Sequence, residues 1–360
     1  MQIDFHHAVT YVAARAAGFD HPEAEKTAYC AQYVDDAVKT GTIAFQNKAL
    51  YDRICSAHKT LDYRNMEELA NHRVWLPFHF LPGNAGKPAG SDPARHFVER
   101  VVCVKDSFVA RDMIAACIGD RHKPYGLHRL GITLHTYADT WAHQGFAGII
   151  HEINDIRDLK DESGAGLRPR DMLSRFFGKL FDQVAGKLVG NTLPLGHGAA
   201  LCFPDLPYLR WSYQDSSGQT IPRDNTVDFL AAADAMCRVM KQYRAGTPGV
   251  LLTGLDAAYK GPMENLFRTV TDKEGEDRHA KWLEAIREGV FPFGPVELDY
   301  DPDGRKSWKS LALGTSKDAA EYPWDESFLT SDWKYFHDAL LDHRFTLIHD
   351  ILPNYNICAA

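Results

Sequence analysis

LHRLGITLHTYADTWAHQGFAG, residues 127–148, is the stretch that decides how this chain is expected to fold. It places His135, Asp139 and His143 at intervals of four residues. Side chains four residues apart lie on the same side of an α-helix, so these three form one stripe. The pattern predicts a helix over residues 125–144 that carries metal-ligand side chains along one face.

The spacing along this helix limits what the stripe can bind. A helix rises about 1.5 Å per residue, so His135 and His143 begin roughly 12 Å apart along the axis, too far to share one small ion. Asp139 lies between them and has two oxygens. The stripe therefore predicts two metal ions bridged by Asp139, one held also by His135 and the other by His143. Imidazole and carboxylate ligands without thiolate favour zinc, with iron or manganese as alternatives.

The first 36 residues predict a helical hairpin. Asp4 is a candidate N-cap of a helix that stops at Gly18, and Asp20 with Glu23 forms the capping-box pattern of a second helix. Two helices joined by so short a turn run antiparallel. The beginning of the first helix is therefore expected beside the end of the second.

Histidines and carboxylates meet at that end of the hairpin. His6 or His7 is expected near Asp35 or Asp36, and the residues alone leave both choices open. Such a convergence is typical of a metal site, although a hydrogen-bonded network gives the same pattern.

Two further segments contain candidate ligands. WLPFHFLPG, residues 75–83, places His79 among apolar and aromatic side chains, where an unpaired imidazole would be costly. LPLGHGAALCFPDLP, residues 193–207, places His197 between two glycines and Asp205 between prolines. A single histidine or aspartate of this kind is more commonly hydrogen-bonded within the fold than bound to a metal. Whether these residues are ligands therefore depends on whether the fold brings them close to the stripe.

Helical spacing dominates the rest of the chain. Amphipathic stretches predict helices over 97–117 and 225–244 and from Ser331 onward, whereas VELDY at 296–300 is a weak strand candidate. We therefore expect an all-α fold, a multi-helix bundle with long loops and a metal cluster at its helical core.

The histidine-bearing elements are spread over some 200 residues and must converge to form one site. We therefore expect residues 1–360 to form a single helical metal-binding domain. The ligands are expected mainly within residues 1–210, with residues 225–360 as a helical C-terminal extension.

Composition excludes several classes of protein. Lys and Arg number 40 against 48 Asp and Glu, a net charge of −8, so no global basic field exists to hold a nucleic-acid backbone. The seven cysteines are scattered singly, which argues against a disulfide framework and against a cysteine zinc site. The N-terminus shows no secretory signal and the chain no transmembrane segment. A cytoplasmic protein is expected.

The order of the candidate ligands resembles that of the bacterial zinc-dependent phospholipase C and single-strand nuclease superfamily. The resemblance covers roughly residues 1–210 and places this chain on a distant, uncharacterised bacterial branch. It implies an all-helical fold, three zinc ions and hydrolysis of phosphate esters. It also implies the distribution of ligands: His6 on one ion of a close pair, Asp35, His79 and His135 on the other with Asp139 bridging, and His143, His197 and Asp205 on the third.

The sequence departs from that family pattern at two positions. Members of the superfamily use the mature N-terminal amine as a ligand, whereas here Met1 lies five residues before His6. The gap from Asp139 to the next histidine, four residues, is shorter than is usual in the superfamily.

The leading hypothesis is a metal-dependent phosphoesterase-type hydrolase in which the ions activate a water molecule. Asp35 and Asp139 are the expected catalytic residues, with Asp35 or Asp36, whichever is not a ligand, orienting the water. Arg129, Lys123 or Arg73 would contact substrate charge. A small-molecule or lipid phosphoester is the expected substrate, and nucleic acid stays open without a basic patch. The oligomeric state is not indicated.

Two other functions remain as alternatives. One is an iron-dependent redox enzyme with a His/carboxylate site, although paired Glu-x-x-His motifs are missing from the candidate helices. The other is a non-catalytic protein in which the histidines hold a structural metal.

Overall fold

The computed structural model describes residues 1–58, 68–91, 96–164 and 195–359. Its α-helices are α1 (Thr10–Ala16), α2 (His21–Asp36), α3 (Glu68–Phe78), α4 (Phe97–Val101), α5 (Phe108–Gly119), α6 (Gly126–Ala142), α9 (Asn225–Ala245), α10 (Ala257–Thr269), α11 (Gly275–Arg287), α12 (Trp308–Leu313) and α13 (Asp332–Phe345). Two π-helices, η1 (Asp4–Val9) and η9 (Thr346–Ile351), and short 3₁₀ turns, η3 (Asn84–Gly86), η4 (Glu152–Asn154), η6 (Gly198–Ala200), η7 (Phe203–Asp205), η8 (Glu326–Thr330) and η10 (Leu352–Tyr355), complete the helical elements.

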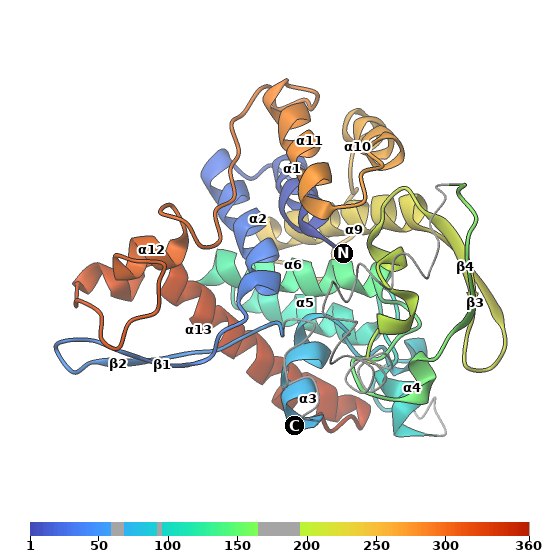
Figure 1. Cartoon of the computed structure of the whole chain (residues 1–360), viewed down its shortest axis with the longest axis horizontal. Helices are drawn as coiled ribbons and strands as arrows, with labels where there is room; N and C mark the ends of the chain where they lie inside the picture. Colours follow the sequence, from blue (N-terminus) through green and yellow to red (C-terminus); the bar gives the residue numbers. More distant parts are fainter. Residues whose placement is uncertain (59–67, 92–95, 165–194, 360) are drawn as a thin grey trace, which may run out of the picture.

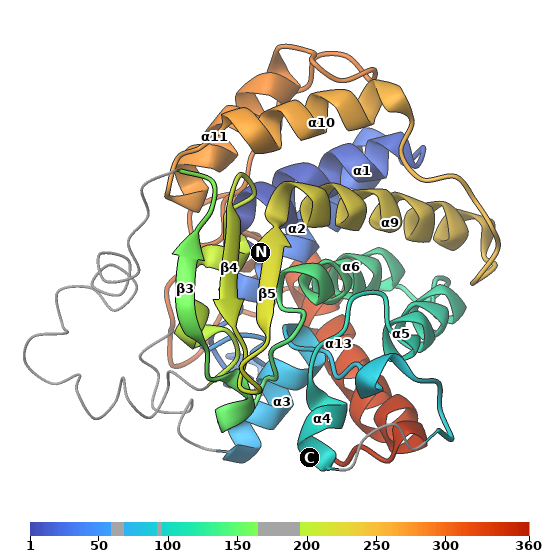
Figure 2. The same cartoon turned by 90° about the vertical axis from the view of Figure 1, so that its right-hand side faces the viewer.

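The expectation of an all-α fold is wrong, because the described residues also form two small antiparallel sheets and the fold is mixed α/β. Figure 2 shows the larger sheet at one side of the molecule. One sheet pairs β1 (Gly41–Ala44) with β2 (Leu50–Arg53), and the other has the order β3 (Arg157–Asp161), β4 (Arg210–Gln214), β5 (Thr220–Asp224).

Two properties make these strands difficult to predict from the sequence. The strands are only four or five residues long. In addition, β3 pairs with β4 across some 50 residues, so no local pattern predicts the pairing. Pro222 lies in β5, at the edge of its sheet, where a missing N–H is tolerated but a strand is not expected from sequence. The weak strand candidate at 296–300 is also wrong, because this segment has no regular structure.

Helix α6 lies at the centre of the fold, in contact with α2, α5, α9 and α13 (Figure 1). Gly131 permits the close approach of α2, since an added Cβ would lie 2.4 Å from Cys30 Cβ and 2.5 Å from the carbonyl oxygen of Thr27. Nearly every side chain of α6 is buried, its polar ones included. Polar residues on a helix buried on all sides must find partners there.

The N-terminal hairpin forms much as the sequence predicts. Asp20 and Glu23 make the expected capping box of α2. Asp4 is not an N-cap, however. It is buried inside η1, and its carboxylate accepts hydrogen bonds from Arg278 of α11, the shortest at 2.6 Å. That buried ion pair ties the start of the chain to the C-terminal half.

Other predicted helices are present with changed limits. The stretch at 97–117 is divided into α4 and α5, and the side chain of Ser107 caps α5. Helix α9 ends at Gly246, which adopts a left-handed conformation, and Ser331 caps α13. Among the described residues, each helix is either too short or too polar to serve as a membrane span.

Candidate metal centre

The stripe on α6 faces the interior of the protein. His135 is fully buried, and Asp139 and His143 are 1% and 4% exposed. The helix ends at Ala142, so His143 stands one residue beyond it, and its backbone N–H still donates to the carbonyl of Asp139. The three side chains therefore project from one rigid element toward one region.

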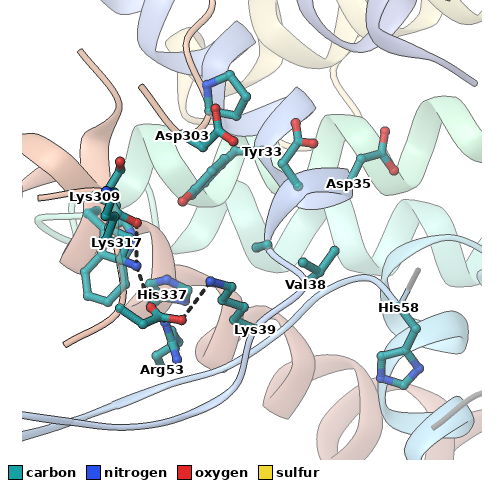
Figure 3. Close-up of a pocket in the computed structure, with 16 residues that line it drawn as sticks. Tyr33, Asp35, Val38, Lys39, Arg53, His58, Asp303, Lys309, Lys317 and His337 are labelled. Atoms are coloured by element: carbon teal, nitrogen blue, oxygen red, sulfur yellow. Dashed lines mark hydrogen bonds and ion pairs between the residues drawn. The ribbon is translucent and has the colours of Figure 1, made fainter. Parts of the chain in front are cut away.

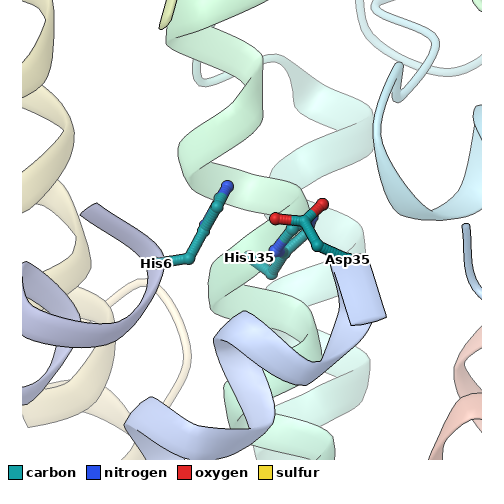
Figure 4. Close-up of side chains that lie close together, drawn as sticks. All are labelled: His6, Asp35 and His135. Atoms are coloured by element: carbon teal, nitrogen blue, oxygen red, sulfur yellow. The ribbon is translucent and has the colours of Figure 1, made fainter. Parts of the chain in front are cut away.

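The hairpin brings two more candidate ligands to this region. His6 of η1 and Asp35, at the end of α2, lie close to His135 and come from two different helices (Figure 4). One ligand atom of each lies within 4.8 Å of the others. The rings of His6 and His135 stack with their centroids 3.8 Å apart.

A second group lies around Asp139. Its Oδ2 is 3.4 Å from His79 Nδ1 and 3.4 Å from His135 Nε2, and its Oδ1 is 3.2 Å from His6 Nε2. His79 and His135 each also lie 3.8 Å from Asp35 Oδ1. Asp139 is thus positioned between His6 on one side and the His79–His135 pair on the other.

The third group combines His143 with His197 and Asp205. His143 Nε2 lies 3.9 Å from Asp205 Oδ1, and His197 Nε2 lies 3.7 Å from Asp205 Oδ2. The two imidazole rings are 4.8 Å apart. The β3–β4–β5 sheet and the start of α9 support this group, because Asn225 donates to the carbonyls on both sides of Asp205 and is held by Trp211 of β4.

Backbone carbonyls orient four of these histidines. In each case one ring nitrogen pairs with a carbonyl oxygen at 2.7–2.9 Å, which makes it the N–H donor and leaves the other nitrogen as a lone pair. The pairs are His135 Nδ1 with Ala31, His143 Nδ1 with His79, His79 Nε2 with Ser56, and His197 Nδ1 with Leu201. The nitrogens left without a hydrogen are the ones that face the carboxylates.

This arrangement brings the lone pairs of two histidines together. His79 Nδ1 and His135 Nε2 lie 3.2 Å apart, and with the other nitrogen of each ring donating to a carbonyl, both present lone pairs. The next atom near both is a carboxylate oxygen of Asp139, 3.4 Å from each nitrogen, and it is also an acceptor. Facing lone pairs in a buried site repel one another unless a cation lies between them.

Burial keeps the imidazoles of His6, His135 and His143 neutral, which is the form that binds metal. It lowers the pKa of His135 to about 4 and that of His143 to about 3, and it lowers the pKa of His6 well below its ordinary value. Both ring nitrogens of His6 are buried and make no aligned hydrogen bond among the described residues. The donor set fits zinc.

The carboxylates of the site also require positive charge. Burial raises the pKa of Asp35, and repulsion from Asp139 raises it further. The pKa of Asp139 itself is held well below its ordinary value, since the surrounding histidines and the Met1 amine outweigh its burial. Three carboxylates, those of Asp35, Asp139 and Asp205, share this small region.

The backbone amine of Met1 lies in the same region. It is 2.8 Å from Asp139 Oδ1 and 3.2 Å from Asp205 Oδ1. Burial alone lowers the pKa of an amine, but these two carboxylates outweigh it and raise the pKa to about 11. As an ammonium, Met1 compensates at most one of the negative charges that these carboxylates carry.

The two alternatives from the hairpin lie elsewhere. His7 turns toward α11, where its Nδ1 lies 2.9 Å from His279 Nε2. Asp36 accepts hydrogen bonds from Tyr300 Oη at 2.6 Å and from Gln32 at 3.1 Å. The structure thus brings His6 and Asp35 to the centre and leaves His7 and Asp36 in hydrogen-bonded networks.

Two of the three basic residues expected to contact substrate are engaged in ion pairs. Arg129 is 1% exposed and pairs with Asp120 and Asp342. Lys123 pairs with the same two carboxylates at 3.1 and 2.8 Å. Their charges are therefore compensated within the fold, and the expectation that they contact substrate is not supported by this arrangement.

Comparison with known proteins places the chain in a family but does not supply a function. A family described as "Family of unknown function (DUF6765)" matches residues 1–351. The chain belongs to the DUF6765 family. The DUF6765 match includes every candidate ligand, from His6 to Asp205. Neither the curated proteins nor the solved structures gave a match.

Some parts of the centre in this DUF6765 member were missed by reasoning from the residues. The backbone carbonyls of Ala31, Ser56 and Leu201 orient histidines. Every residue has such a carbonyl, so the identity of these residues does not indicate that role. In the sequence, the Met1 amine is visible only as a departure from the superfamily pattern. Its position between Asp139 and Asp205 depends on η1 folding against α6, which no local pattern predicts.

Proposed function

We propose that this chain is a metal-dependent hydrolase of phosphate esters, with zinc as the preferred ion. The observation that carries the proposal is the pair of facing lone pairs on His79 and His135, 3.2 Å apart beside the Asp139 carboxylate. Cations relieve the repulsion within a buried cluster of acceptors, and imidazole with carboxylate is the ligand set of zinc hydrolases.

The three groups suggest two or three ions. His6, Asp35, His79 and His135 would hold a close pair with Asp139 between them, and His143, His197 and Asp205 would hold a further ion. Iron or manganese are alternative occupants of the same ligands. The Met1 amine, placed between Asp139 and Asp205, would add a nitrogen donor once deprotonated.

Bound ions would polarise a phosphoryl oxygen and activate a water molecule. The protein's own contribution is the geometry of the carboxylates. Asp139 is 1% exposed and fixed by its neighbours, so it would hold the ions and bridge them. The side chain of Asp35 is 31% exposed, so it is the carboxylate that reaches solvent and can orient a water and accept its proton.

The charge distribution favours a small substrate. The net charge of −8 does not attract a polyanion over a long surface. A small-molecule or lipid phosphoester needs only the local positive field of the ions. A single nucleic-acid strand would have to be bound by the same local contacts.

The test is the metal content of protein purified without chelator or affinity metal, followed by turnover of bis(p-nitrophenyl) phosphate and p-nitrophenyl phosphate. We expect roughly two to three zinc ions per chain. Asp139→Asn should lose two of them and His143→Ala one, and both should lose turnover. His349→Ala, an exposed residue near the C-terminus, is the matched control and should keep both metal and turnover.

The contrary outcomes separate the alternatives. Bound iron with oxygen-dependent chemistry would favour the redox enzyme. Full zinc content without turnover of any phosphoester would favour a structural metal. Protein that holds no metal, and whose melting temperature is unchanged by zinc, would overturn the metal centre itself.

A further inference from the structure

A pocket of about 790 Å³ opens next to Asp35. It lies between the end of α2, the β1–β2 hairpin, the segment around α12 and one face of α13 (Figure 3). Its volume is within the range of roughly 300–1,000 Å³ that is typical of small-molecule sites. Asp35 thus belongs both to the candidate metal centre and to the pocket wall.

Cations gather at one end of this pocket. Lys39 Nζ and Lys309 Nζ lie 2.7 and 2.6 Å from the carboxylate of Asp318, and Arg53 NH1 lies 3.2 Å from it. Lys317 lines the pocket beside them. Three cations on one carboxylate leave an excess of positive charge, which Lys317 increases.

The cations differ in how they can be used. The side chain of Lys39 is 56% exposed, and Lys317 is also exposed, so both can turn to a ligand. The side chain of Arg53 is 13% exposed, and Asp318 and the Thr40 carbonyl hold its guanidinium, so it adds a fixed positive charge to the pocket wall. Lys309 is 8% exposed and donates to the Ser316 carbonyl as well as to Asp318, so it holds the cluster in place.

Apart from Asp318, the acidic residues of the pocket lie away from this cation cluster. Figure 3 shows Lys39, Arg53, Lys309 and Lys317 grouped together, with Asp35 well away from them. Asp36 is engaged by Tyr300 and Gln32. Asp303 lines the wall near Tyr33, so an anion would bind among the cations and not between Asp303 and Asp35.

We infer that this pocket binds a second anionic group of the substrate, a phosphate or a carboxylate, through Lys39, Arg53 and Lys317. This rests on the proposed function, in which the ester phosphate is bound at the metal centre on the Asp35 side. The substrate class is then a small phosphoester that carries a second acidic group. Compact anions of either kind share the chemistry that a cluster of lysine and arginine recognises.

The first experiment measures inorganic phosphate binding to metal-free protein by calorimetry at low ionic strength. We expect binding that is weakened about fivefold or more by Lys39→Ala and by Arg53→Gln, since each removes a charged donor. Asp318→Asn should tighten binding, because it removes the internal anion that competes for the cations. A thermal melt of each variant verifies folding.

Lys48→Ala is the matched control. Lys48 lies in the same hairpin, is 80% exposed and pairs with one acid, Glu321, at 3.0 Å, but it is outside the pocket. It should leave phosphate affinity unchanged. An equal loss in Lys48→Ala would show that only the general charge matters, and would overturn the inference.

The second experiment uses zinc-loaded protein and two aryl phosphates that differ by a carboxylate on the ring. We expect a higher kcat/KM for the carboxylated substrate, and Lys39→Ala should remove this preference by lowering kcat/KM more for the carboxylated substrate than for the one without the carboxylate. Phosphate binding that requires zinc and is insensitive to Lys39→Ala would overturn the pocket and leave the hydrolase standing. Binding that Lys39→Ala weakens in a protein without hydrolytic activity would support the anion pocket and overturn its assignment to a hydrolase substrate.

Discussion

His143 donates its Nδ1–H to the backbone carbonyl of His79 over 2.7 Å, so one candidate ligand orients another. The two residues come from different elements, His143 from the end of α6 and His79 from the residue after α3. The hydrogen bond fixes the ring of His143 and the chain at His79 together. The group around Asp205 and the group around Asp139 therefore share a backbone support, and their ligands are held in a common frame.

The two adjacent histidines of η1 should behave differently. His6→Gln should lose at least one ion, because its ring lies 3.2 Å from Asp139 and stacks on His135. His7→Gln should keep the full metal content and lose stability instead, since His7 is buried against His279. Metal analysis with thermal melts of both variants is the measurement. Equal metal loss in the two would contradict the placement of η1.

The carboxylates at the end of α2 form a second matched pair. Asp35→Asn should weaken metal binding more than about tenfold and abolish turnover, because it removes a charged oxygen from the centre. Asp36→Asn should retain the metal, since its amide oxygen can still accept the hydrogen bond from Tyr300. Zinc affinity by competition with a chromophoric chelator distinguishes them. Unchanged affinity in Asp35→Asn would remove Asp35 from the ligand set.

Gly131→Ala should separate α2 from α6. The added Cβ would meet Cys30 Cβ at 2.4 Å and the Thr27 carbonyl at 2.5 Å, which costs about 1–3 kcal/mol of unfolding free energy. Metal affinity should also fall, because Asp35 and His135 lie on the two separated helices. Gly119→Ala at the end of α5, where the new Cβ meets nothing within 4 Å, is the control and should be neutral or stabilising.

The unfolding free energy should fall as the pH is lowered from 6.5 toward 3. Burial lowers the pKa of His343 to about 3, whereas in the unfolded chain it is near 6.5. Between these values the unfolded state binds a proton that the folded state does not, so acid favours unfolding by about 1.4 kcal/mol per pH unit for this group. The stability is fully present above pH 6.5.

Urea titrations at several pH values, with chelator present throughout, measure that slope. His343→Gln should make the slope shallower by about one proton, whatever it does to the stability at neutral pH. His349→Gln, exposed on the following π-helix η9, should leave the slope unchanged. An unchanged slope in His343→Gln would mean that the ring is protonated in the folded protein.

Local patterns accounted for the helical part of the fold. The four-residue spacing of His135, Asp139 and His143 and the capping box at Asp20 are properties of neighbouring residues, and both helices form. The sheets were missed because strand pairing is not local. Strand β4 pairs with β3 across a long interval, and its partner β5 contains Pro222. The all-α expectation was therefore wrong because strands distant in the sequence pair with each other, and not because the expected helices failed to form.

The residue types of the candidate site were determined by the sequence alone. Eight histidine and aspartate side chains could be named as ligands because their chemistry and their order along the chain are visible there. Which of two neighbours turns inward was decided by the tertiary structure. The Asp4–Arg278 ion pair and the packing of η1 rotate His6 toward α6 and His7 toward α11, and both contacts span more than 270 residues.

The same division applies to the pocket. The lysines and arginine of the pocket are visible in the sequence only as scattered charges. Lys39 lies just before β1 and Arg53 is the last residue of β2, whereas Lys309 and Asp318 lie more than 250 residues later. The sequence specifies which chemical groups are available for a site. Hydrogen bonds and ion pairs act over only a few ångströms, so these groups form a site only when folding packs distant segments together.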